Sequence, residues 1–126
     1  MKALGLKRVA LLTPYVQSIN DMMRGYIQAR DIEVPVMGSF NNCDDDQVAR
    51  ISLQSTKVAA IELARSEHVD GIFVSCTSMR TIDIIAEVEA ETGVPMLGSN
   101  PAQAWHMLRL GGVKDKLPQW GRLFTV

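Results

Sequence analysis

The sequence predicts one α/β domain in which helices cover both faces of a parallel sheet. Short apolar segments alternate four times with longer amphipathic ones, and this order favours parallel strands joined by right-handed helical crossovers. The chain has 126 residues, a length typical of a single domain. No repeat or low-complexity linker divides it. We therefore expect a three-layer, flavodoxin-like domain with a four-stranded parallel sheet.

The first two strands enclose an amphipathic helix. Residues 7–12 form a short apolar run that ends at Pro14, because proline removes a donor from the ladder. From Ile19 onward apolar residues recur at helical spacing, which predicts a helix over 18–30 with Ser18 as its N-cap. Residues 32–37 are again apolar and β-branched, and predict a second strand before the polar loop 38–42.

The middle of the chain predicts the longest helix and a buried strand. Three aspartates at 44–46 precede a proline-free stretch, which predicts one helix over 44–66 with acidic residues in its first turn. Residues 70–75 contain a continuous apolar run, which is typical of a central strand covered on both faces. A third helical stripe starts at Met79 and ends at Gly93, a typical C-cap.

The last part predicts a short edge strand and a closing helix. Pro95 within the apolar segment 94–97 favours the start of a strand or an edge position. Ser99 and Pro101 have the pattern of a cap followed by a first-turn proline, and predict a helix to about residue 111. The segment after it is irregular, with room for one further short strand over 122–126.

Composition excludes several classes of function. Lys plus Arg number 13 and Asp plus Glu 14, for a net charge of −1, so no basic excess exists to hold nucleic acid. Two cysteines are too few for a disulfide scaffold and fit a reducing compartment. No apolar run approaches the ~20 residues of a membrane span, and the first residues lack signal-peptide features. We expect a cytoplasmic protein with free thiols, no nucleic-acid partner and no membrane partner.

Polar residues directly after the predicted strands mark the expected ligand site, because ligands of such sheets bind at the carboxyl ends of the strands. Hydroxyl, amide, thiol and carboxylate groups are concentrated there, and helix N-termini attract anions. The pattern predicts a pocket for a small carboxylate. The four segments are 13–15, 39–46, 75–78 and 98–100.

Cys76 is the most distinctive of these residues. We expect it between a strand and the first turn of a helix, where the dipole and the N–H groups of Thr77 and Ser78 favour the reactive thiolate. The alternative is a small buried residue at a strand end, a common position for free cysteine. Both interpretations remain open on the residues alone.

The other candidates also have two interpretations. Tyr15 is placed to donate to a substrate oxygen or to pack its ring under a loop, and Ser99 and Asn100 fit either carboxylate binding or helix capping. Cys43 lies beside three aspartates, which raise a thiol pKa, so we interpret it as structural or incidental. No histidine or cysteine has a metal-ligand spacing, so no metal site is expected.

The motifs together resemble the aspartate/glutamate racemase superfamily, and most closely its branch with maleate isomerase, arylmalonate decarboxylase and the racemase-like protein of ectoine utilisation. The loops at 13–15 and 39–52 are most similar to the last of these. The resemblance covers about residues 6–124. Its motifs are 73–81 (FVSCTSMRT), Glu89, 93–95 (GVP), 99–100 (SN), 105–109 (WHMLR) and 121–123 (GRL).

The resemblance implies that this chain is one lobe, equivalent to the second half of a family member. Such enzymes are similar to two tandem flavodoxin-like lobes that hold the substrate between them, with one cysteine from each lobe in the racemases and isomerases. By this pattern Cys76 is the second-lobe acid/base, or the proton donor of a decarboxylase. Tyr15 matches a tyrosine that contacts a substrate carboxylate, and the backbone of Thr77 and Ser78 matches part of a carboxylate cradle.

Two departures from the family pattern matter. Cys43 does not match the first-lobe cysteine, so a two-cysteine site is incomplete within this chain. Maleate isomerases bind substrate with an asparagine after the second strand, for which Asn42 is our candidate here. The neighbouring aspartates repel anions, which disfavours maleate itself as the substrate.

The sequence therefore predicts a cofactor-independent isomerase or racemase lobe acting on a small carboxylate or amino-acid derivative, with little turnover in isolation. Cys76 would move the proton, and donors would stabilise the carbanion-like state. The alternatives are a non-catalytic carboxylate-binding domain and a decarboxylase of the arylmalonate type. An unpaired lobe leaves an apolar surface, so we expect a homo-oligomer or pairing with a first lobe. The candidate donors are Tyr15, Thr77, Ser99 and Asn100, and the expected substrate-binding residues are these four with Ser78 and Asn42.

Overall fold

A four-stranded parallel sheet forms the centre of the computed structural model, which describes residues 1–42 and 44–126. The strand order is β2-β1-β3-β4, so β1 and β3 are central and β4 is an edge, as Pro95 predicted. Cys43 lies outside the described residues. The strands are β1 (Val9–Thr13), β2 (Met37–Ser39), β3 (Gly71–Val74) and β4 (Met96–Gly98).

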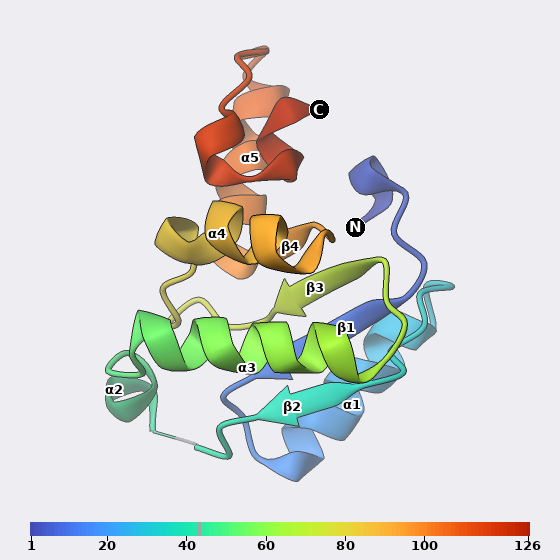
Figure 1. Cartoon of the computed structure of the whole chain (residues 1–126), viewed down its shortest axis with the longest axis vertical. Coiled ribbons are helices and arrows are strands. Elements are labelled where there is room, and N and C mark those ends of the chain that lie inside the picture. The colour runs from blue at the N-terminus through green and yellow to red at the C-terminus, as the bar shows by residue number, and fades with distance from the viewer. Residues whose placement is uncertain (43) are drawn as a thin grey trace.

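Helices cover both faces of this sheet, which confirms the predicted three layers (Figure 1). Ala60 of α3 (Leu53–Ser66) and Val88 of α4 (Ile82–Thr92) belong to one cluster of buried side chains. Ile27 of α1 (Gln17–Gln28) belongs to a second cluster, against which Leu108 of α5 (Ser99–Leu110) packs. In Figure 1, α3 lies in front of the sheet and α1 behind it.

The predicted single helix over 44–66 is wrong, because two caps divide it. Asp44 accepts hydrogen bonds from two backbone N–H groups of the short helix α2 (Asp45–Val48). Ser52 then caps α3 and accepts from the backbone N–H of Ser55 at 3.0 Å. The acidic first turn is confirmed, since Asp45 and Asp46 begin α2.

Several predicted boundaries also differ from the structure. The second strand is β2 at Met37–Ser39, whereas residue 33 contributes only an isolated bridge to Arg8. Val16 rather than Ser18 is the N-cap residue of α1, and Gly98 rather than Ser99 is that of α5. Gly93 ends α4, as predicted.

The C-terminal segment folds as 3-10 helices, so the strand considered for residues 122–126 is wrong. It consists of η2 (Pro118–Trp120) and η3 (Arg122–Thr125). The buried carboxylate of Glu89 fixes it, accepting from the backbone N–H groups of Met96 and Arg122, both at 2.9 Å. Gly121 has a φ of 97°, and a Cβ there would overlap Ile85.

Among the described residues, every helix is too short or too polar to cross a bilayer.

Candidate functional site

Tyr15 and Cys76 meet at the carboxyl edge of the two central strands. β1 and β3 are paired with Leu12 opposite Val74, and the backbone N–H of Ser75 continues the ladder to Leu12 at 2.9 Å. The residues that follow these strands therefore lie in adjacent loops. The half-buried Tyr15 packs against the cluster of buried side chains that contains Cys76, and its phenol interacts with the Cys76 thiol.

This environment keeps the phenol of Tyr15 protonated. Burial raises its pKa to about 12, helped by the hydrogen bond with Cys76 and the negative charges of Cys76 and Asp45. A phenol in low-dielectric surroundings near negative charge resists ionisation. At neutral pH Tyr15 is thus a hydrogen-bond donor beside the thiol, which suits stabilisation of an oxyanion.

Cys76 does not lie directly before the first turn of a helix, so its predicted position at a helix N-terminus is wrong. A turn follows β3, and α4 begins only at Ile82. The backbone N–H of Ser78 does reach the sulfur, at 3.3 Å. Cys76 is 4% exposed and packs with the cluster under α3 and α4. The structure thus combines both interpretations of this residue, a buried strand-end thiol and a sulfur with polar neighbours.

Three polar side chains fix the backbone of Tyr15, and Asn20 among them was missed by the sequence analysis. Asn20 is 1% exposed, and its Nδ2 donates to the carbonyl of Tyr15 at 2.8 Å. Thr13 Oγ1 donates to Asn20 Oδ1 and accepts from the N–H of Tyr15. Ser39 Oγ donates to the same Tyr15 carbonyl. The available signal was the position of Asn20, three residues before Met23 on the buried stripe of α1.

The first turn of α5, which follows β4 directly, joins the Cys76 loop through Asn100. Its side-chain Nδ2 donates to the carbonyl of Thr77 at 2.8 Å. Ser99 is the first residue of α5, beside Asn100, so its backbone N–H belongs to a free helix terminus. The structure therefore brings Thr77, Ser99 and Asn100 to the same edge as Cys76.

Asn42 is occupied within its own loop. Its Nδ2 donates to Gln47 Oε1 and its Oδ1 accepts from the N–H of Asp44, both at 3.0 Å. Its backbone N–H donates to the carbonyl of Pro14 at 2.6 Å. The side chain therefore supports the start of α2, whereas Asp45 of the same segment acts on Tyr15 by its charge.

Comparisons with known proteins agree with this fold and motif. The sequence profile of the family described as arylmalonate decarboxylase matches residues 1–124. The chain is 36% identical to an arylmalonate decarboxylase of Bordetella bronchiseptica, covering 98% of this chain and 52% of that protein. It is 30% identical to a maleate isomerase of Nocardia farcinica, covering 98% of this chain and 49% of that protein.

Solved structures show the same relationship. Unliganded arylmalonate decarboxylase superposes with a TM-score of 0.87 at 32% identity, covering 98% of this chain and 54% of that one. A maleate isomerase of Pseudomonas putida superposes with a TM-score of 0.92 at 30% identity, covering 98% of this chain and 50% of that one. A third structure is a cysteine-to-serine mutant of the Nocardia farcinica maleate cis-trans isomerase with a covalently bound succinylcysteine intermediate. It superposes with a TM-score of 0.88 at 26% identity, covering 98% of this chain and 51% of that one.

The matched length is a further finding, because the chain spans about half the length of the curated relatives it matches. The profile nevertheless covers nearly all of this chain. The predicted resemblance is confirmed, and the chain belongs to the arylmalonate decarboxylase family, within the aspartate/glutamate racemase superfamily.

Proposed function

We propose that this chain is one lobe of a cofactor-independent enzyme that transforms a small carboxylate, with Cys76 as its acid/base or nucleophile. The observation that carries the proposal is that Tyr15 packs against the cluster that contains Cys76 at the carboxyl edge of the sheet, where its phenol interacts with the thiol. A thiol beside a neutral donor supplies the two groups needed for proton transfer next to a carboxylate.

In the isomerase or racemase reaction, the Cys76 thiolate removes a proton from the carbon next to the carboxylate. The electron pair of the broken C–H bond moves into the carboxylate, giving an enediolate. In this proposal the hydroxyl of Tyr15 and the N–H groups in the first turn of α5 stabilise its charge. A proton delivered to the opposite face would complete the inversion, and the partner lobe would supply that second acid.

Addition of the sulfur to a substrate carbon is the other route for an isomerase. The thiolate forms a C–S bond to an alkene carbon while the π electron pair moves into the adjacent carboxylate as an enediolate. After rotation about the resulting single bond, this pair re-forms the C=C bond and the C–S bond breaks, which releases the thiolate. The succinylcysteine intermediate of the Nocardia farcinica relative supports this chemistry for the family. Both routes need a substrate that reaches the sulfur, and Tyr15 packs over the cluster that contains Cys76.

We propose that the substrate is a small carboxylate of low negative charge, such as an amino-acid derivative. A maleate isomerase relative was solved with maleate. Here, however, the charge of Asp45 acts on Tyr15, and a second carboxylate on the substrate would be repelled there. Monocarboxylates are therefore the favoured class. A cytoplasmic location and a link to ectoine utilisation stay predictions from the sequence.

The test is a chimera in which this chain replaces the second half of the Bordetella bronchiseptica decarboxylase. Substrate turnover and exchange of the α-proton with deuterium oxide are measured by NMR, with Cys76→Ser and Tyr15→Phe compared with the parent. We expect little turnover by the 126-residue chain alone, activity in the chimera, and loss of at least about 100-fold in Cys76→Ser. A Cys76→Ser chimera as active as its parent excludes the catalytic role.

Two other functions are favoured by specific observations. Decarboxylation of an arylmalonate-type substrate is favoured by the 36% identity to the decarboxylase, and carbon dioxide release by the chimera would identify it. A non-catalytic carboxylate-binding domain is favoured by the burial of Cys76, which is 4% exposed. Binding of a carboxylate that survives Cys76→Ala, with no α-proton exchange in the parent, would support that function.

A further inference from the structure

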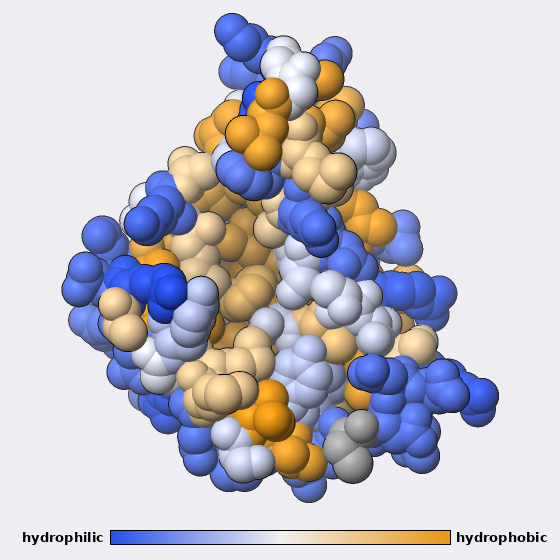
Figure 2. Space-filling model, turned by 180° about the vertical axis from the view of Figure 1, so that it is seen from behind, coloured by the Kyte–Doolittle hydropathy of each residue, from blue (hydrophilic) through white to orange (hydrophobic). Residues whose placement is uncertain are grey.

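The side of β3 that faces α1 is an open apolar groove. A strand at the centre of a parallel sheet is normally covered on both faces, yet Phe73 is half-buried while the other residues of β3 are buried. The predicted cover of this strand is thus incomplete only at Phe73, on the side of α1. A cavity of about 420 Å³ lies there. Figure 2 shows this face hollowed at its centre over a hydrophobic floor.

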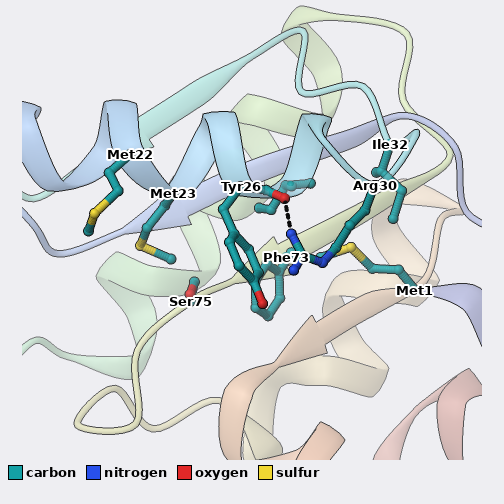
Figure 3. Close-up of a pocket in the computed structure, with 9 residues that line it drawn as sticks. Met1, Met22, Met23, Tyr26, Arg30, Ile32, Phe73 and Ser75 are labelled. Atoms are coloured by element: carbon teal, nitrogen blue, oxygen red, sulfur yellow. Dashed lines mark hydrogen bonds between the residues drawn. The ribbon is translucent and has the colours of Figure 1, made fainter.

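Methionines and aromatic rings form the walls of the groove. Met22, Met23 and Tyr26 come from α1, and Phe73 and Ser75 come from β3 and the turn after it (Figure 3). Met22 is 64% exposed and Tyr26 is 62% exposed. A contiguous apolar surface of this kind marks a site of association with another apolar surface.

The first six residues have the hydrogen bonds of a helix C-terminus. The N–H of Gly5 donates to the carbonyl of Lys2, and the N–H of Leu6 donates to the carbonyl of Met1, at 3.0 and 3.3 Å. Gly5 has a φ of 67°. This pair of bonds around a left-handed glycine is the Schellman motif that terminates α-helices. In this structure it follows only the short turn η1 (Lys2–Leu4).

The same turn opens directly into the groove. Met1 lines the cavity, and Figure 3 places it with Ile32 at one end, while Met22 and Ser75 lie at the other. A helix that ended in the Lys2–Leu4 turn would therefore lie along the groove. It would run in the same direction as α1 and opposite to β3, the usual arrangement of helices on parallel sheets.

We propose that this groove is the docking site of an amphipathic α-helix that is continuous with the Lys2–Leu4 turn and is supplied by the other lobe of the family fold. About half of each relative's length lies outside the part that this chain matches, so the family provides such a partner. The groove runs from Met22 of α1 to Arg30, just beyond the end of that helix. This distance is about 12 Å at 1.5 Å per residue, so two to three helical turns fill it.

The docked helix also has a consequence for the candidate site. Its N-terminal end would lie at Ser75, the neighbour of Cys76 in sequence. The residues that precede the helix would then reach the carboxyl edge of the sheet, where Cys76 and Tyr15 meet. The groove thus explains how a second lobe is brought to the thiol from one side.

The test attaches a helix of about 14 residues to the N-terminus of the 126-residue chain. One version has leucine at the groove-facing positions, and the matched control has glutamine there with every other residue unchanged. Hydrogen exchange of the β3 and α1 amides and the urea midpoint of unfolding are measured. We expect the leucine version to slow exchange at least about tenfold and to raise the midpoint, and the glutamine version to do neither.

Met22→Glu provides the groove-specific variant, because Met22 is exposed and contributes little to the unextended chain. It should remove the gain of the leucine version. Equal exchange and equal midpoints for the two extensions would overturn the proposal. It would also be overturned if the unextended chain sedimented as a dimer that Met22→Glu dissociates, because the groove would then bind a second copy.

Discussion

The pKa of Tyr15 provides a direct measure of its contact with Cys76. The chain has two tyrosines, so Tyr26→Phe leaves Tyr15 as the only phenol, and Tyr26 is exposed. With a pKa of about 12, roughly a tenth of Tyr15 is ionised at pH 11, whereas about nine tenths of an ordinary tyrosine is ionised there. Phenolate absorbance during a pH titration measures this fraction.

Substitutions around Tyr15 should lower this pKa in a defined order. Burial is the largest cause, followed by the hydrogen bond and charge of Cys76, and then by the charge of Asp45. Cys76→Ala should therefore move the pKa part of the way toward 10, and Asp45→Asn should move it less. Full return to the ordinary value is expected only on unfolding in urea.

The same shift makes the stability depend on alkaline pH. Because the folded pKa is raised, the folded protein keeps a proton that the unfolded chain loses, so the contribution to stability is present below pH 10 and is lost as pH rises toward 12. Two pKa units correspond to at most about 2.7 kcal/mol, and solvent screening of the half-buried ring reduces this to about 1 kcal/mol. If Tyr15 titrates near 10 in the parent, or is unaffected by Cys76→Ala, the contact that supports the proposed function is absent.

Three further substitutions test the framework around the site by urea denaturation. Glu89→Ala leaves two backbone N–H groups without an acceptor and should cost about 2–5 kcal/mol, whereas Glu87→Ala, at an exposed ion pair, should cost less than about 1 kcal/mol; equal costs would contradict the role of Glu89. Gly121→Ala should cost at least about 1–3 kcal/mol, because its positive φ and its close neighbour both oppose a methyl group. Asn20→Ala should cost about 1–3 kcal/mol and speed hydrogen exchange in the loop 13–15, whereas unchanged exchange would show that this side chain does not fix the loop.

The sheet was predictable because apolar runs and their alternation with helices are local properties of the sequence. The edge position of β4 followed from Pro95, since a missing donor is tolerated there. The division of 44–66 into α2 and α3 was not predicted, because a serine such as Ser52 also occurs inside helices, and only its bond to Ser55 shows that it caps one.

The places of the site residues in the fold were predictable from the sequence, but only some of their side-chain contacts were. Tyr15 and Cys76 follow neighbouring strands, so their proximity follows from the strand order. The hydrogen bond from Asn20 to the Tyr15 carbonyl and that from Asn42 to Gln47 depend on side-chain directions, which residue spacing does not give. Where α4 begins depends on the length of the turn after β3, and the helical stripe from Met79 did not show that this turn extends to Thr81.

The groove and the thiol occupy opposite sides of the chain at the end of β3. Successive residues of an extended segment point to opposite faces, and Ser75 lines the cavity beside α1 while Cys76 packs in the cluster under α3 and α4. A helix in the groove therefore contacts Ser75 without covering the sulfur. For the same reason the two proposals fail separately: Met22→Glu changes docking without touching Cys76, and Cys76→Ser changes the chemistry without altering the groove wall.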